Sequence, residues 1–146
     1  FAATQYPTNS LDMTLRVLQT EVQAALEQPN CVVLDVRTPE EYRGDIFMMK
    51  PPEGEERGGH IAGAIHLEHT LTLNEDGTFK AADELHALYS SQGITADKVV
   101  FPYCAIGGRS AYTWFVLTYL LGYPQVRNYD GSWNEWSRLP HAPIEQ

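Results

Sequence analysis

The chain has 146 residues, of which 43% are hydrophobic and 20% are charged, as in an ordinary globular protein with a single domain. Its 19 acidic and 10 basic residues give a formal net charge of -9, which repels phosphate backbones, so we expect no nucleic-acid partner. The most apolar stretch, 114–121, is too short to span a bilayer, and we expect no membrane partner.

The first residue and the cysteine content bear on the cellular compartment. The sequence starts with Phe1 rather than a methionine, and no signal peptide is visible in it. We expect a cytoplasmic protein, with a periplasmic location as the alternative if a signal peptide has been removed. The two cysteines, Cys31 and Cys104, could form one disulfide, but a domain of this size with a good core does not need one.

The first third of the chain predicts a lead-in followed by a strand and a short helix. Residues 1–30 form the lead-in, with a short strand over 14–18 and a helix over 20–28. The domain body, 31–140, begins with the apolar run 31–36, which is typical of a buried parallel strand. Thr38, Pro39 and Glu41 then fit a helix start, because threonine caps the helix, proline suits its first position and glutamate closes the capping box.

The rest of the body alternates strands with helices. We predict a surface excursion over 44–59, strands over 64–68, 98–104 and 126–130, and helices over 81–91, 109–121 and 132–136. The helix over 109–121 is the longest and is apolar almost all round, and Gly122 ends it. This alternation predicts an α/β fold with a central parallel sheet of about five strands and helices on both faces.

Cys104 is the candidate catalytic residue, because it stands where a predicted strand meets a tight loop and a long helix. Ligands bind at this edge of an α/β sheet. The helix amino terminus and the cation of Arg109 both lower the pKa of a nearby thiol. Gly107 and Gly108 allow positive φ, so that backbone N–H groups can converge on the sulfur. A buried structural cysteine beside a glycine turn is the plainer alternative.

The spacing around Cys104 separates three kinds of cysteine chemistry. Phosphatase-like and arsenate-reducing sites need one more residue between cysteine and arginine than the four that separate Cys104 from Arg109. A cysteine hydrolase needs a histidine base, and none of the 5 histidines lies in a recognisable partner motif. Sulfur transfer needs neither, because a thiolate attacks a sulfane sulfur and the acceptor then attacks the outer sulfur.

Four stretches of the chain, in order, resemble the signatures of the rhodanese family. They are the run Leu34-Asp35-Val36-Arg37-Thr38-Pro39-Glu40-Glu41-Tyr42, the run Gly59-His60-Ile61-Ala62-Gly63-Ala64, the loop Cys104-Ala105-Ile106-Gly107-Gly108-Arg109, and the run Asn128-Tyr129-Asp130-Gly131-Ser132-Trp133-Asn134-Glu135-Trp136. Residues 57–60 and 74–85 look most like the catalytic C-terminal domain of tandem-domain thiosulfate/3-mercaptopyruvate sulfurtransferases.

This resemblance implies a rhodanese-like three-layer fold and a persulfide on Cys104, with no separate cofactor and no metal. The implied reaction moves a sulfane sulfur from thiosulfate or 3-mercaptopyruvate to cyanide or a thiol. A small anionic donor, a nucleophilic acceptor and a second rhodanese domain are the implied partners. A rhodanese-like domain used only for binding is the remaining alternative.

The predicted site extends beyond the cysteine. We expect substrate contacts from the loop and from an aromatic residue after the last strand: Ala105, Ile106, Gly107, Gly108, Arg109, Ser110 and Trp133. We expect structural roles for the signature residues Asp35, Arg37, Glu41, His60 and Asp130, with Asp35 and Arg37 paired to Glu41 or anchoring a loop. Ala105 stands where thiosulfate-using relatives often have a basic residue, but Arg109 favours thiosulfate because it can pair with a sulfonate-like oxygen.

Overall fold

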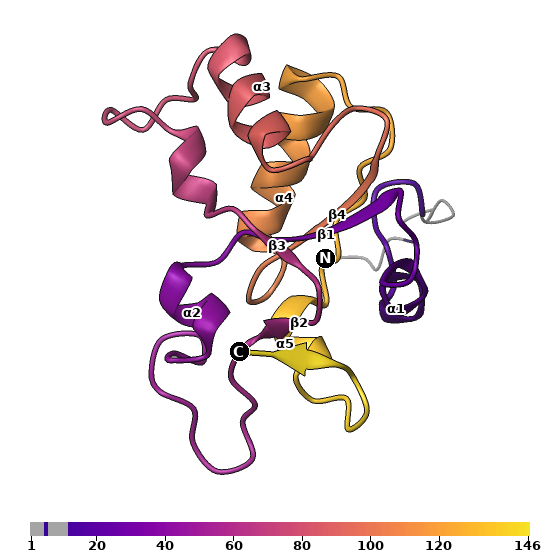
Figure 1. Ribbon diagram of the computed structural model, residues 1–146, viewed down its shortest axis with the longest axis vertical. Coiled ribbons are helices and arrows are strands. Elements are labelled where there is room, and N and C mark those ends of the chain that lie inside the picture. The colour runs from indigo at the N-terminus through magenta and orange to yellow at the C-terminus, as the bar shows by residue number, and fades with distance from the viewer. Residues whose placement is uncertain (1–4, 6–11) are drawn as a thin grey trace.

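The computed structural model describes residue 5 and residues 12–146, so residues 1–4 and 6–11 of the predicted lead-in over 1–30 lie outside the described residues. The elements, drawn in Figure 1, are α1 (Gln19–Ala25), β1 (Cys31–Asp35), α2 (Pro39–Arg43), β2 (His60–Ile61), β3 (Ile65–His66), the 3-10 helix η1 (His69–Thr72), α3 (Ala82–Ser91), β4 (Val99–Tyr103), α4 (Gly108–Phe115), the π-helix η2 (Val116–Leu120), α5 (Ser132–Trp136) and β5 (Ile144–Glu145).

A parallel sheet with the strand order β3-β1-β4 forms the centre of the fold. β1 and β4 pair along their whole length, from Cys31 opposite Val99 to Asp35 opposite Tyr103. Isolated parallel bridges continue the sheet, one between Val100 and Val126 and one between Arg16 and Asn128. The segments predicted as strands over 14–18 and 126–130 therefore join the sheet through single bridges, and the predicted parallel sheet of about five strands is confirmed in this form.

Two hydrophobic clusters cover the two faces of the sheet. Because side chains alternate along a strand, Val33 and Phe101 point to one face, where α1 and α5 pack. Val32 and Val100 point to the other face, against α3 and α4. Figure 1 shows the sheet between these two groups of helices. The three-layer α/β fold expected from the sequence is confirmed.

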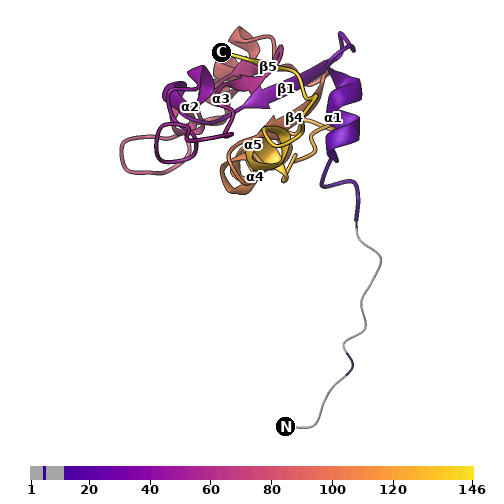
Figure 2. The ribbon, with the colours of Figure 1, turned by 90° about the horizontal axis from the view of Figure 1, so that it is seen from below.

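The short helix α2 has the predicted capping box. The Thr38 hydroxyl accepts a hydrogen bond from the Glu41 N–H, and a Glu41 carboxylate oxygen accepts one from the Thr38 N–H. Pro39 occupies the first turn, and Gly44 ends the helix with a left-handed φ of 87°. α2 follows the carboxyl end of β1 and lies away from α1 in both views (Figures 1 and 2). Its first turn is thereby placed at the edge of the sheet where ligands bind.

Two predictions need correction in this architecture. The excursion over 44–59 is not wholly on the surface, because Phe47 is 4% exposed and belongs to the core. The predicted helix over 109–121 is α4 followed by η2, and it is not buried all round. Phe115 and Tyr119 are exposed, whereas the polar Thr113 is buried. None of the helices in the described part of the chain is long and apolar enough to cross a membrane.

Candidate active site

Cys104 directly follows β4 and is almost completely buried. Its sulfur accepts a hydrogen bond from the backbone nitrogen of Gly107 at 3.2 Å, and it lies 3.7 Å from the hydroxyl oxygen of Ser110, whose single hydrogen can go to this sulfur or to the Gly107 carbonyl at 3.0 Å. The loop from Cys104 to Gly107 therefore curves round the sulfur before α4 begins. This arrangement provides the converging donors that the sequence predicts.

The surroundings of Cys104 favour its thiolate. Burial raises the pKa of the thiol, but hydrogen bonds from the Ser110 amide and hydroxyl and from the amides of Ile106 and Gly107 outweigh that effect. The pKa of Cys104 is consequently lower than that of an ordinary cysteine. A thiolate is the nucleophilic form of cysteine, so the geometry favours attack by this sulfur.

Only one of the two glycines in the loop adopts the positive φ that the sequence analysis allows for both. Gly107 has a φ of 93°, and a β-carbon there would lie 2.8 Å from the backbone oxygen of Asp130. Gly108 lies outside the positive-φ region, so only Gly107 needs glycine's backbone freedom. The Asp130 backbone thus packs closely against Gly107, whereas its side chain forms an exposed 3.1 Å ion pair with Arg16.

Helix α5 holds the loop from the other side, which sequence reasoning missed. The Cys104 N–H donates to the Ser132 hydroxyl at 3.1 Å, and the Trp133 N–H donates to the Cys104 carbonyl at 3.0 Å. The Asn134 N–H donates to the Ala105 carbonyl at 3.0 Å. Ser132 has a φ of 55°, a strained value for a residue with a side chain. That strained serine, 28 residues from Cys104, has no local sequence signal.

Arg109 is not a free cation. Its two terminal nitrogens donate to the two carboxylate oxygens of Glu41, at 2.7 and 2.8 Å. Burial raises the pKa of Glu41, but the hydrogen bonds from Arg109 and from the Thr38 amide outweigh it, and the pKa is lowered. Of the two roles predicted for Asp35 and Arg37, pairing to Glu41 is therefore wrong, and anchoring of a loop is the one that the structure shows.

Arg37 instead forms a fully buried pair with Asp35, with 2.6 Å between the closest nitrogen and oxygen. It also donates to the Gly59 carbonyl at 2.7 Å, which anchors the chain before β2. The Arg37 guanidinium carbon lies 4.6 Å above the Trp133 ring, a cation–π contact. Trp133 is 0% exposed, so it supports the core under Arg37 and does not line the substrate site as predicted.

His60 is buried against Tyr42 of α2. Its ring stacks on Tyr42 with 3.6 Å between centroids, and its Nδ1 lies 2.9 Å from the Tyr42 carbonyl oxygen. Among residues 5 and 12–146, no group of three or more His, Cys, Asp and Glu side chains is arranged to hold a metal ion. Both cysteines, Cys31 and Cys104, are free thiols.

A cavity of about 670 Å³ opens over Cys104. Its lining combines residues from α2, the segment after it and the cysteine loop: Thr38, Glu41, Ile46, Met48, Met49, Cys104, Ala105, Ile106, Gly108 and Arg109. Four predicted contacts, Ala105, Ile106, Gly108 and Arg109, line this cavity, whereas Gly107 and Ser110 bind the sulfur from below it. The apolar segment 46–49 was missed, because glycines, prolines and charges dominate the excursion around it.

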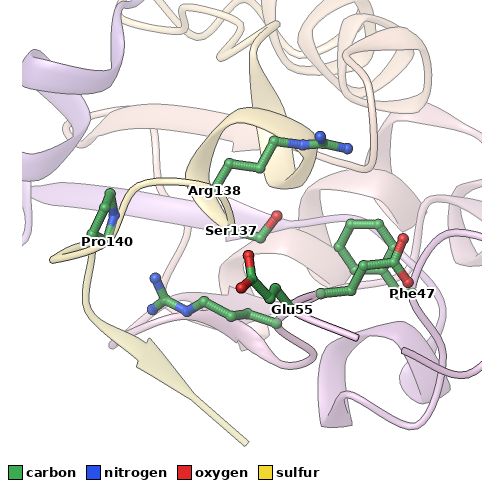
Figure 3. A pocket seen from close by; sticks show the side chains of 7 residues that line it. Phe47, Glu55, Ser137, Arg138 and Pro140 are labelled. Atoms are coloured by element: carbon green, nitrogen blue, oxygen red, sulfur yellow. The ribbon is translucent and has the colours of Figure 1, made fainter. Parts of the chain in front are cut away.

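A second cavity of about 330 Å³ is lined in part by Phe47 of that segment. Figure 3 shows Phe47, Glu55, Ser137, Arg138 and Pro140 around it. Its lining contains no cysteine, and both of its arginines are already engaged: Arg57 donates to the carbonyls of Leu139 and Ala142 at 2.7 Å, and Arg138 donates to the backbone and side-chain oxygens of Asn134. The cavity over Cys104 is therefore the candidate active site.

The match to a known family covers this site. Residues 18–139 match the rhodanese-like domain family. The chain belongs to that family.

This rhodanese-like domain is 54% identical over 114 residues to the sulfur carrier protein TtuD of Thermus thermophilus, a match that covers 77% of the chain and 40% of the relative. It is 47% identical over 135 residues to a provisionally named thiosulfate sulfurtransferase of Haloferax volcanii, over 90% of the chain and 46% of the relative. The chain thus spans about half the length of the curated relatives it matches.

Solved structures give the same fold. The rhodanese-like domain superposes on a variant of EanB in complex with hercynine with a TM-score of 0.83 and 29% sequence identity. The match covers 91% of this chain and 32% of that one. A variant of EanB in complex with ergothioneine matches equally well, with a TM-score of 0.83.

Proposed function

We propose that this rhodanese-like domain is a sulfurtransferase that carries a sulfane sulfur on Cys104. The observation that carries the proposal is the buried sulfur of Cys104, which accepts hydrogen bonds from Gly107 and Ser110 at the base of an open cavity. The names of the relatives, a sulfur carrier protein and a thiosulfate sulfurtransferase, support the same chemistry.

The reaction has two steps. Each step leaves a negatively charged sulfur, first on the persulfide and then on the Cys104 thiolate, beside the hydrogen-bond donors around Cys104. The thiolate attacks the outer sulfur of thiosulfate, the S–S bond of thiosulfate breaks, and its electron pair leaves with sulfite. The product is a Cys104 persulfide with its negative charge on the outer sulfur. Cyanide or a thiolate then attacks that outer sulfur, and the electron pair of the breaking bond returns to Cys104. Hydrogen-bond donors fixed in advance stabilise this charge without reorganisation.

We propose thiosulfate as the donor because Arg109 lines the cavity beside Cys104. The ion pair with Glu41 uses two of the five N–H donors of its guanidinium, which leaves others for a sulfonate-like oxygen. Hydrogen bonding to Glu41 raises the pKa of Arg109 against the opposing effect of burial, and the negative charge of Cys104 raises it further, so the guanidinium stays charged. Because the relatives are about twice as long, we also propose a second rhodanese domain as a partner.

Sulfur loading followed by release tests the proposal. The protein is treated with thiosulfate, its intact mass is measured, and cyanide is added. We expect the mass of one added sulfur, loss of that sulfur on cyanide addition, and release of thiocyanate. A Cys104→Ser variant serves as the control and takes up no sulfur. Loading that survives this substitution, or hydrolysis of phosphate esters in place of loading, would overturn the proposal.

A further inference from the structure

The Ser110 hydroxyl has one hydrogen and two acceptors within reach. Its oxygen lies 3.0 Å from the Gly107 carbonyl oxygen and 3.7 Å from the Cys104 sulfur. A hydroxyl donates a single hydrogen, so only one of these acceptors receives it at a time. The carbonyl is the closer acceptor, and a bond to it takes the hydrogen away from the sulfur. The other donors to that carbonyl therefore decide whether the sulfur receives a hydrogen bond from Ser110.

Two further donors reach the Gly107 carbonyl. Gly107 is the N-cap residue of α4, and its carbonyl accepts the first bond of the helix from the Ala111 N–H at 3.0 Å. The side-chain amide of Asn128 donates to the same oxygen at 3.3 Å. A carbonyl oxygen has two lone pairs, and these two N–H groups occupy both of them. The Ser110 hydroxyl is then one donor too many for the carbonyl, and the sulfur is its remaining acceptor.

The backbone of Asn128 is fixed by the sheet and not by the cysteine loop. Its N–H donates to the Leu15 carbonyl, and its carbonyl accepts from the Val17 N–H, both at 3.0 Å. The next residue, Tyr129, donates its N–H to the Pro102 carbonyl of β4 at 3.0 Å. The amide of Asn128 is therefore presented to the loop from a rigid element.

The side chain of Asn128 satisfies only one half of its amide. Its Oδ1 atom is buried and accepts no hydrogen bond within the described part of the chain. An unpaired buried acceptor costs free energy, so stability alone gives no reason for an amide at this position. The Nδ2 group is the half that is used, because only a donor can bind the Gly107 carbonyl.

We propose that Asn128 is a positioning residue that directs the Ser110 hydroxyl to the Cys104 sulfur, by occupying the carbonyl that this hydroxyl would otherwise bind. The inference deepens the proposed sulfurtransferase function and rests on it for its meaning in catalysis. A fixed donor stabilises both the attacking thiolate and the thiolate that returns after transfer. Asn128 is not part of the cavity lining, so it acts through Gly107 and Ser110.

The charged side chains around the thiol are already paired. Arg109 pairs with Glu41 in the cavity lining, and Asp130 pairs with Arg16. Replacement of Asn128 by another neutral residue leaves all four charges unchanged. A shift in the titration of the thiol in such a variant therefore reports its hydrogen bonds.

Alkylation of Cys104 as a function of pH tests the proposal. Asn128→Leu replaces the amide by a side chain of similar size that cannot donate, and the freed lone pair of Gly107 then takes the Ser110 hydrogen. The thiolate loses a donor, so we expect the midpoint of alkylation by iodoacetamide to rise by about 0.5–1 pH unit. Mass measurement of the Cys104 peptide separates this reaction from that of Cys31. The midpoint of urea unfolding should stay close to the native value, because the Gly107 carbonyl keeps two donors.

The same substitution in a Ser110→Ala protein separates positioning from a general loosening of the loop. Without the hydroxyl, the Asn128 amide has nothing to redirect, so we expect Asn128→Leu to shift the midpoint by less than about 0.2 pH unit. Asn128→Val, which suits a strand, repeats the comparison with a smaller side chain. Asn74→Leu removes another amide that donates to a carbonyl, that of Phe79 at 3.0 Å, and as the matched control it keeps the native midpoint.

The outcomes separate this inference from the proposed function. Sulfur loading from thiosulfate is measured on the same proteins by intact mass, whereas alkylation needs no sulfur transfer. Failure of the native protein to load sulfur overturns the proposed function, and the alkylation midpoints still decide the role of Asn128. An unchanged midpoint in Asn128→Leu, or an equal shift with and without the Ser110 hydroxyl, overturns the inference alone.

Discussion

The carboxylate of Glu41 in α2 accepts hydrogen bonds from both terminal nitrogens of Arg109 in α4, which lies 68 residues later in the sequence. This pair closes the polar side of the cavity over Cys104 and sets the position of the only arginine in the cavity lining. Such two-bond contacts give geometric specificity as well as energy. Arg109 is therefore presented to a donor in one orientation.

Removal of this arginine is expected to affect the two substrates differently. In Arg109→Ala, kcat/KM for the anionic thiosulfate should fall about tenfold or more, because a charge-assisted hydrogen bond is lost. The value for 2-mercaptoethanol as acceptor should change much less. Steady-state kinetics with each substrate varied in turn measure both values. An equal loss for donor and acceptor would argue against a role of Arg109 in anion binding.

The lowered pKa of Cys104 predicts how its reactivity depends on pH. The thiolate is populated above the pKa of the folded protein, so alkylation by iodoacetamide should rise with a midpoint below the value of about 8.5 for a free cysteine. Ser110→Ala removes one donor to the sulfur, and its midpoint should move to higher pH. A midpoint unchanged by this substitution would show that the Ser110 hydroxyl does not stabilise the thiolate.

Gly107 offers a test of backbone geometry with a matched control. Gly107→Ala forces an L residue to positive φ and sets its β-carbon against the Asp130 backbone at 2.8 Å. Gly63→Ala has a similar φ of 74° but meets nothing within 4 Å. We expect the control to lose about 1–2 kcal/mol of the free energy of unfolding, and Gly107→Ala to lose clearly more. Urea denaturation of both variants decides it, and equal losses would contradict the close contact.

The buried Asp35 and Arg37 pair should dominate the electrostatic part of the stability. Arg37→Met leaves the Asp35 carboxylate buried without its partner, which costs about 3–5 kcal/mol. Arg43→Met breaks an exposed pair with Asp45, and we expect a loss of at most about 1 kcal/mol. Thermal or urea unfolding compares the two variants. Similar losses would mean that the Asp35 carboxylate is solvated or protonated once Arg37 is removed.

The parts of the fold that follow from the sequence are those with a strong local signal. The apolar run over 31–36 and the capping residues Thr38 and Glu41 gave β1 and α2, and the position of Cys104 after a strand gave the site. Contacts between distant segments have no such signal. The sequence does not show whether Glu41 pairs with Arg109 or with Arg37, because both arginines are candidates until the chain folds.

Two further features of the site could not be predicted from sequence patterns, each for a different reason. Trp133 looked like a wall of the site, but an aromatic residue near a cysteine loop has the same pattern whether it faces a cavity or the core. The segment 46–49 is surrounded by glycines, prolines and charges, so its composition indicates solvent. Phe47 is nevertheless buried in the core, and Met48 and Met49 line the cavity over Cys104.

The contacts between α5 and the cysteine loop have a consequence for protein synthesis. The Ser132 hydroxyl and the amides of Trp133 and Asn134 bind the backbone of Cys104 and Ala105, so the loop depends on residues made well after the cysteine. A nascent chain that has left the ribosome only as far as α4 has its cysteine but not these contacts. Because domains fold as units, the loop takes its final shape round the Cys104 sulfur only once α5 has been made.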